Sequence, residues 1–139
     1  MKQAQDRLSH EIVEFYEKLS SWEASVVKDT GYSLPQIHAV EILGANGAMR
    51  MKELAEKMGI TTGTLTVQID KMEQAGLVIR KAHQADRRAI LVDLTDVGLG
   101  IYKEHDQLHH GLTNQITAKF SDQELQLLLQ FFEQMNREF

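Results

Sequence analysis

Apolar residues recur every three or four positions through the first part of the chain, as they do along one face of an amphipathic helix. This spacing predicts a first helix of about 20 residues that ends near 29–31, where glycine favours termination. A second helix is expected to begin at Ser33, with Pro35 in its first turn, and to run up to Gly44 and Gly47. The stripe of the first helix is formed by Leu8, Ile12, Phe15, Tyr16, Leu19, Trp22 and Val26.

The middle of the chain predicts two short helices followed by a hairpin. The first covers 51–58 and is closed by Gly59, and the second runs from the hydroxyl-rich start at 61–64 to Ala75. The apolar period then changes to two in 77–81 and 89–94, which predicts two strands. The polar stretch 82–88 joins them, so we expect a hairpin with an extended tip.

Two more helices are expected after the hairpin. Thr95 is a candidate N-cap for a helix that continues to about Lys119. Ser121 with Glu124 fits the capping-box pattern and starts the last helix. The order helix–turn–helix–hairpin is that of a winged helix. We therefore expect a mainly α (α+β) fold in a single domain, 1–139, with 33–94 as the winged helix-turn-helix and long helices in 1–32 and 95–139.

The formal net charge of −5 is unevenly distributed. Between Met49 and Ile90 eight lysines and arginines face five aspartates and glutamates, a balance of +3, so the remainder of the chain carries −8. A basic middle between acidic ends indicates that one part meets an anion such as nucleic acid.

Composition removes several classes of protein. Without cysteine there is no disulfide, thiolate metal site, catalytic thiol or thiol redox sensor. The sequence has no apolar run long enough for a membrane span and no secretory signal, so we expect a cytoplasmic protein. It also lacks a Gly-x-Ser-x-Gly elbow, a phosphate loop and a dinucleotide fingerprint. His105 and His109 do not form the HExxH motif of metalloproteases, because Asp106 rather than Glu follows His105. We expect no enzyme.

The second short helix and the hairpin tip supply the candidate contacts to double-stranded DNA. Small hydroxyls and an amide at the start of a recognition helix can approach phosphates and base edges in the major groove, and long cationic donors suit the minor groove. The hydroxyls at the start of this helix can alternatively serve only to cap it. A second alternative is that the winged helix binds a protein partner instead of DNA. The predicted contacts are Thr61, Thr62, Thr64, Thr66, Gln68, Lys71, His83, Arg87 and Arg88.

Several segments together resemble the MarR family of bacterial transcriptional regulators: 51–60 (MKELAEKMGI), 70–78 (DKMEQAGLV), Asp86-Arg-Arg88 and 94–98 (LTDVG). The resemblance implies a homodimer built on the terminal helices, with two winged helices on a palindromic operator. It also implies that Asp86 positions Arg88 at the minor groove. The family often has a basic residue where this chain has Val67, which leaves Thr64, Thr66 and Gln68 as the stronger candidates for base contacts.

The apolar stripes of the terminal helices also favour a dimer. They exceed what a core of about 90 residues needs, so a second copy is expected to cover them. The alternative is that the stripes close a monomeric core.

Histidines outside the DNA-binding half suggest a metal effector. His105 and His109 are four residues apart and share one helical face, so they can hold one cation. The resemblance to the family implies that the helix of His38 lies close to that of His105. Carboxylates can complete a site that suits Zn²⁺ better than a soft metal. The candidate oxygen ligands are Glu23, Glu41 and Glu104.

This arrangement resembles the zinc-responsive repressors of zinc-uptake genes within the family. Gln36-Ile37-His38 matches their Gln-x-His, and Glu104-His105 with His109-His110 matches their Glu-His and His-His pairs. Ile37 replaces a ligating Glu, no cysteine matches their thiolate, and the His-His pair lies one residue further along. The resemblance implies Zn²⁺ as a co-repressor.

Other effectors remain open. A small aromatic ligand in a pocket between the dimer and DNA halves would release DNA rather than strengthen its binding. Tyr16, Trp22, Tyr32 and His38 are the candidate pocket residues. The histidines can also be ordinary solvated or hydrogen-bonded side chains, with no effector at all.

Overall fold

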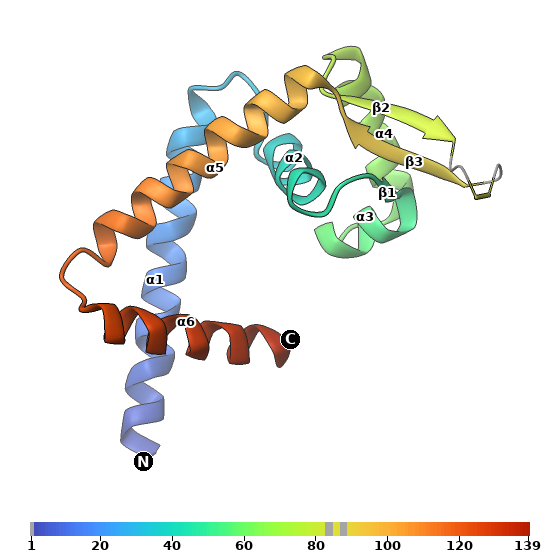
Figure 1. Ribbon diagram of the computed structural model, residues 1–139. Helices are drawn as coiled ribbons and strands as arrows, with labels where there is room; N and C mark the ends of the chain where they lie inside the picture. The colour runs from blue at the N-terminus through green and yellow to red at the C-terminus, as the bar shows by residue number, and fades with distance from the viewer. Residues whose placement is uncertain (1, 83–84, 87–88) are drawn as a thin grey trace. The chain divides into compact units, whose positions relative to one another are not determined.

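A computed structural model describes residues 2–82, 85–86 and 89–139. The chain divides into two compact units, Met1–Tyr102 and Lys103–Phe139. Figure 1 shows the elements, which in chain order are α1 (Lys2–Lys28), α2 (Leu34–Asn46), β1 (Met49–Arg50), α3 (Met51–Met58), α4 (Thr62–Gln74), β2 (Val78–Ala82), β3 (Ile90–Leu94), α5 (Asp96–Ile116) and α6 (Asp122–Arg137).

The two helices at the start of the first unit form as their sequence predicts, with one difference in length. α1 has 27 residues and begins at Lys2, before the apolar stripe starts, because the polar residues that precede the stripe also favour helix. α2 begins with a capping box: the backbone N–H of Gln36 donates to the Ser33 hydroxyl at 3.3 Å, and the backbone N–H of Ser33 donates to the Gln36 side chain at 3.0 Å.

The sheet has three antiparallel strands in the order β1–β3–β2. The hairpin pairs Val78 with Leu94 at its base and Ala82 with Ile90 toward its tip, and it projects beyond α4 and α3 in Figure 1. β1 pairs Met49 with Val92 and was not predicted, because two residues are too short to show a period.

The core of the winged helix lies where α2, α3, α4 and the sheet meet. Leu54, Leu65, Ile69, Met72 and Val92 are completely buried there. Leu65, Ile69 and Met72 are spaced four and three apart, so one face of α4 is fixed against the core and the opposite face stays exposed.

The start of α5 is tied to the turn that follows α4. The Thr95 hydroxyl donates to the Gly76 carbonyl at 2.5 Å and accepts from the backbone N–H of Gly98 at 3.1 Å, which confirms Thr95 as the cap of α5. The backbone N–H of Thr95 donates to the Leu77 carbonyl at 3.0 Å. Gly98 lies so close to this turn that an added Cβ would be 2.2 Å from the Leu77 oxygen. The hydrogen bonds and close packing of 94–98 therefore hold the start of α5 against the turn that follows α4.

The second unit contains most of α5 and all of α6. α5 ends at Ile116, slightly before the predicted end, and α6 begins with the predicted capping box. In that box the Ser121 backbone N–H donates to the Glu124 carboxylate at 2.8 Å, and this hydrogen bond lowers the pKa of Glu124. None of the helices in the described part of the chain combines the length and apolar character needed to cross a membrane.

Candidate nucleic-acid interface

The exposed face of α4 carries most of the residues predicted to contact DNA. Thr61 is the N-cap, and its hydroxyl accepts from the backbone N–H of Thr64 at 3.1 Å. The buried face of the helix turns the other side chains outward. The exposed residues are Thr61, Thr62, Gly63, Thr64, Thr66, Val67, Asp70 and Lys71.

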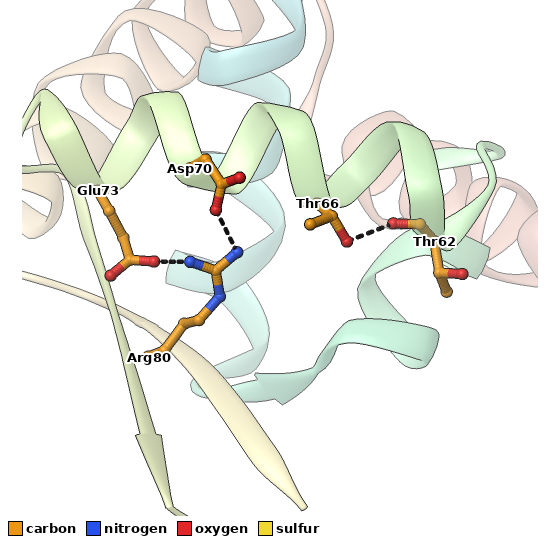
Figure 2. Close-up of polar contacts among 5 residues, drawn as sticks. All are labelled: Thr62, Thr66, Asp70, Glu73 and Arg80. Carbon is orange, nitrogen blue, oxygen red and sulfur yellow. Dashed lines mark hydrogen bonds and ion pairs between the residues drawn. The ribbon is translucent and has the colours of Figure 1, made fainter.

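The threonine hydroxyls on this face differ in what they can offer. The Thr61 hydroxyl donates to that of Thr64 at 3.0 Å, so the hydroxyl proton of Thr64 points elsewhere and can meet a phosphate. The Thr66 hydroxyl donates to the Thr62 carbonyl at 2.8 Å (Figure 2), which leaves Thr66 an acceptor and a methyl group. Capping and exposure coexist here, so the capping role of Thr61 does not remove the hydroxyls from the surface.

Gln68 differs from the other predicted contacts. Its side-chain oxygen is buried and has no hydrogen-bond partner in the described part of the structure. A glutamine that reads adenine uses its oxygen and nitrogen together at the base edge. With the oxygen turned inward, Gln68 cannot make that paired contact in this conformation.

Arg80 on β2 holds the hairpin to α4, and sequence reasoning did not assign it this role. Figure 2 shows its guanidinium between two carboxylates of α4, paired with Asp70 at 2.8 Å and with Glu73. Asp70 and Glu73 are three residues apart and thus adjacent on the helix. Two carboxylates at this spacing on a helix, followed by an arginine on the next strand, are the sequence pattern that could have predicted these ion pairs. One guanidinium thereby links α4 to the hairpin.

The basic residues of the middle segment therefore divide into two groups. Arg80 is neutralised by α4, and Lys81 pairs with Asp93 across the hairpin at 2.7 Å. Among the described residues, the exposed lysines and arginines of this segment outside these pairs are Arg50, Lys52, Lys57 and Lys71.

The tip of the hairpin is only partly described. His83, Arg87 and Arg88 lie outside the described residues, so the predicted minor-groove contacts and the pairing of Asp86 with Arg88 stay predictions. At the base of the tip the Ala89 backbone N–H donates to the Asp86 carbonyl at 3.0 Å. An open cavity of about 340 Å³ lies here, lined by Arg50, Met51, Asp86, Ala89 and Ile90.

His105 and His109 face each other on α5, as their spacing predicts. Their Nε2 atoms are 3.1 Å apart and their ring centroids 4.8 Å apart, and His105 is only 3% exposed. Two nitrogens bound to a tetrahedral Zn²⁺ at about 2.0–2.1 Å lie about 3.3 Å apart, so the pair has the spacing of two zinc ligands.

Two of the predicted oxygen ligands lie close together in the first unit. Glu23 on α1 and Glu41 on α2, both half-buried, bring carboxylate oxygens within 4.8 Å of each other in the first unit. His38 and Glu104 are exposed, and the exposed His110 lies 3.5 Å from Asp106.

The residues proposed for an aromatic effector pocket are not equally covered. Tyr16 on α1 is 67% exposed, and His38 on α2 is exposed as well. Trp22 is half-buried, and Tyr32 is partly buried against the core of the winged helix. Trp22 and Tyr32 are thus the better placed of the four to shield a ligand from water.

Both terminal helices carry large apolar side chains that their own unit leaves exposed. On α1 these are Leu8, Ile12, Val13, Phe15 and Tyr16, and on α6 they are Leu127, Leu129, Phe131, Phe132 and Met135. α6 has no fully buried residue, so its own unit provides no core for it. Apolar faces of this extent are typical of interaction surfaces.

Comparisons with known proteins agree with this geometry. Residues 32–90 match the model of the MarR family. The chain is 26% identical over 97 residues to the HTH-type transcriptional regulator MhqR of Bacillus subtilis, which covers 70% of the chain and 67% of the relative. It is 36% identical over 64 residues to the organic hydroperoxide resistance transcriptional regulator of the same organism, which covers 46% and 44%. The chain thus spans less than half of the second relative's length and about two thirds of the first's.

The solved structures extend the likeness to the whole fold. A MarR family protein from Bacillus stearothermophilus has a TM-score of 0.89 at 21% identity, with 99% of this chain and 96% of that one covered. Streptococcus pneumoniae FabT, solved in complex with DNA, has a TM-score of 0.79 at 18% identity, with 95% and 94% covered. NadR in complex with 4-hydroxyphenylacetate has a TM-score of 0.75 at 22% identity, with 90% and 89% covered. By its matched residues and its helix–turn–helix–hairpin geometry, the winged-helix region of this chain is similar to that of the MarR family of transcriptional regulators.

Proposed function

We propose that the chain is a transcriptional repressor that binds operator DNA as a homodimer. The observation that carries the proposal is the exposed hydroxyl-rich face of α4, linked to a hairpin by Arg80. Such a helix enters the major groove while the hairpin tip reaches the adjacent minor groove. The structure of FabT, which shares the fold and was solved in complex with DNA, supports DNA as the ligand.

The apolar faces of α1 and α6 support the homodimer. A second copy would cover them, and two-fold symmetry would place two α4 helices about one DNA turn, roughly 34 Å, apart. The operator is then a palindrome with half-sites at that spacing.

Replacing Arg87 and Arg88 together with alanine is expected to abolish tight operator binding. Each arginine that reaches a groove contributes about 1–3 kcal/mol, so loss of both should lower affinity at least about thirtyfold. The measurement is fluorescence anisotropy on a duplex selected from a random library. The wild-type affinity should also fall steeply with salt, because phosphate contacts release counterions.

The control for this experiment removes two positive charges elsewhere, with Lys2→Ala and Arg7→Ala on α1. Equal affinity of the wing variant and the wild type would refute the wing contacts. If the wild type selects no duplex, or its affinity is indifferent to salt, the chain is better explained as a winged-helix module that binds a protein.

For the effector, we propose Zn²⁺ as a co-repressor held by His105 and His109. The spacing of their Nε2 atoms, 3.1 Å, and the burial of His105 support a chelating pair. The carboxylates of Glu23 and Glu41 are the proposed source of oxygen ligands. An ion bound more tightly by the DNA-competent state than by the other shifts the dimer toward DNA by that difference in affinity.

Removing the histidine pair tests the metal. We expect zinc to raise operator affinity in the wild type, and His109→Gln as well as the double variant His105→Ala with His109→Ala to lose both zinc binding and this response. Zinc content by elemental analysis, the visible spectrum of the Co²⁺ form and anisotropy give independent measurements. His10→Ala, an exposed histidine on α1, is the control.

The remaining sequence-predicted ligands are tested in the same way with His38→Ala, Glu104→Gln and His110→Ala. Wild-type protein that binds operator equally well with and without zinc would end the co-repressor model.

A small aromatic ligand is the second candidate effector. NadR was solved with 4-hydroxyphenylacetate, and a relative 27% identical over 129 residues is the homoprotocatechuate degradative operon repressor of Escherichia coli. Trp22, the single tryptophan of the chain, reports such binding by its fluorescence. The direction of the change in DNA affinity distinguishes the two effectors, because an aromatic ligand is expected to weaken DNA binding and zinc to strengthen it.

A further inference from the structure

Val67 stands at the centre of the face of α4 that would meet DNA, and it has no polar group. Its side chain is 55% exposed, although the other face of the helix is packed into the core. A single exposed valine is ordinary on a protein surface. Val67 lies among the predicted DNA contacts, so a base edge that faces it would have to be recognised without a hydrogen bond from this side chain.

The neighbours of Val67 leave it accessible. Gly63 precedes it by one helical turn, and a Cβ there would meet only the Thr61 hydroxyl at 4.0 Å, so nothing shields Val67 on that side. The hydroxyl proton of Thr66 is used by the Thr62 carbonyl at 2.8 Å. Asp70, one turn later, is paired with Arg80 at 2.8 Å, so its negative charge is partly compensated.

The major groove offers one apolar group to such a surface. Thymine carries a methyl group at C5, whereas cytosine has only hydrogen there, and the purine edges present hydrogen-bonding atoms. Gln68 does not compensate by reading adenine, because its side-chain oxygen is buried. We propose that Val67 selects thymine in each operator half-site by packing against the C5 methyl group. This inference rests on the proposed DNA-binding function and specifies its chemistry.

The test uses a duplex selected by the wild-type protein, in which each thymine is replaced in turn by uracil. This change removes only the C5 methyl group. At one position per half-site we expect a loss of about fourfold in affinity, the value of about 0.8 kcal/mol for one buried methyl. Val67→Ala should bind the thymine duplex more weakly and should no longer distinguish thymine from uracil at that position.

The matched control is Val97→Ala, because Val97 on α5 is 57% exposed and lies outside α4. It should keep the full preference for thymine. If the wild type binds the selected duplex but tolerates uracil everywhere, or if Val67→Ala keeps the preference, the inference is overturned while DNA binding stands. If the wild type selects no duplex, the proposed function fails first.

Discussion

Gly98→Ala is expected to lower the free energy of unfolding by about 2–4 kcal/mol, since overpacking against a rigid partner costs this much. The new Cβ would lie 2.2 Å from the Leu77 carbonyl oxygen and 3.1 Å from a methyl of Leu94. The carbonyl belongs to the backbone and already accepts from Thr95, so it cannot move without breaking that hydrogen bond. Urea denaturation followed by circular dichroism, at one fixed protein concentration, measures the change.

Gly100→Ala is the matched control on the same helix. An added Cβ there meets nothing within 4 Å, so the greater helix propensity of alanine should stabilise the protein by about 0.5–1 kcal/mol. The two substitutions are chemically identical and are expected to act in opposite directions. Equal denaturation midpoints for Gly98→Ala and the wild type would contradict the close approach of α5 to the turn after α4.

Arg80→Met is expected to reduce operator affinity about tenfold and stability by about 1–2 kcal/mol. The methionine keeps the apolar stem but leaves Asp70 and Glu73 as two unpaired carboxylates, three residues apart on the recognition helix. They would repel each other and the DNA phosphates, and the hairpin would lose its link to α4. Anisotropy and urea denaturation give the two quantities.

Three further variants separate position from charge. Lys81→Met also removes one positive charge from β2 but breaks only the pair with Asp93, so it should weaken binding less. Arg80→Lys keeps the charge yet cannot form the fork that spans two carboxylates, and only partial recovery is expected. Adding Asp70→Asn and Glu73→Gln to Arg80→Met should restore part of the affinity, because these changes remove the repulsion but not the loss of the link to the hairpin. If that combined variant binds as weakly as Arg80→Met alone, the electrostatic explanation is wrong.

Periodicity and capping were sufficient to predict most of the fold. The four–three spacing of Leu65, Ile69 and Met72 predicts both the helix and its buried face, because this periodicity depends only on residues within a single helix. The same holds for the capping box at Ser121. β1 escaped prediction because its two residues become a strand only through pairing with β3.

The interface was less predictable because it depends on contacts between elements. Arg80 could be counted as a cation but not assigned to Asp70 and Glu73, since the hairpin must first fold back onto α4. Gln68 is predicted as a base contact from its position on the helix, and only packing shows that its oxygen is buried. The His105–His109 pair was predictable from spacing, because both residues lie on one helix.

The most direct test of the account is dimethyl sulfate protection on a duplex selected by the wild-type protein. The reagent methylates guanine N7 and so reports what occupies the major groove. The account predicts two protected segments about one helical turn apart, one for each α4 of a dimer. A bound complex in which every guanine N7 stays accessible would contradict the placement of α4 in the major groove.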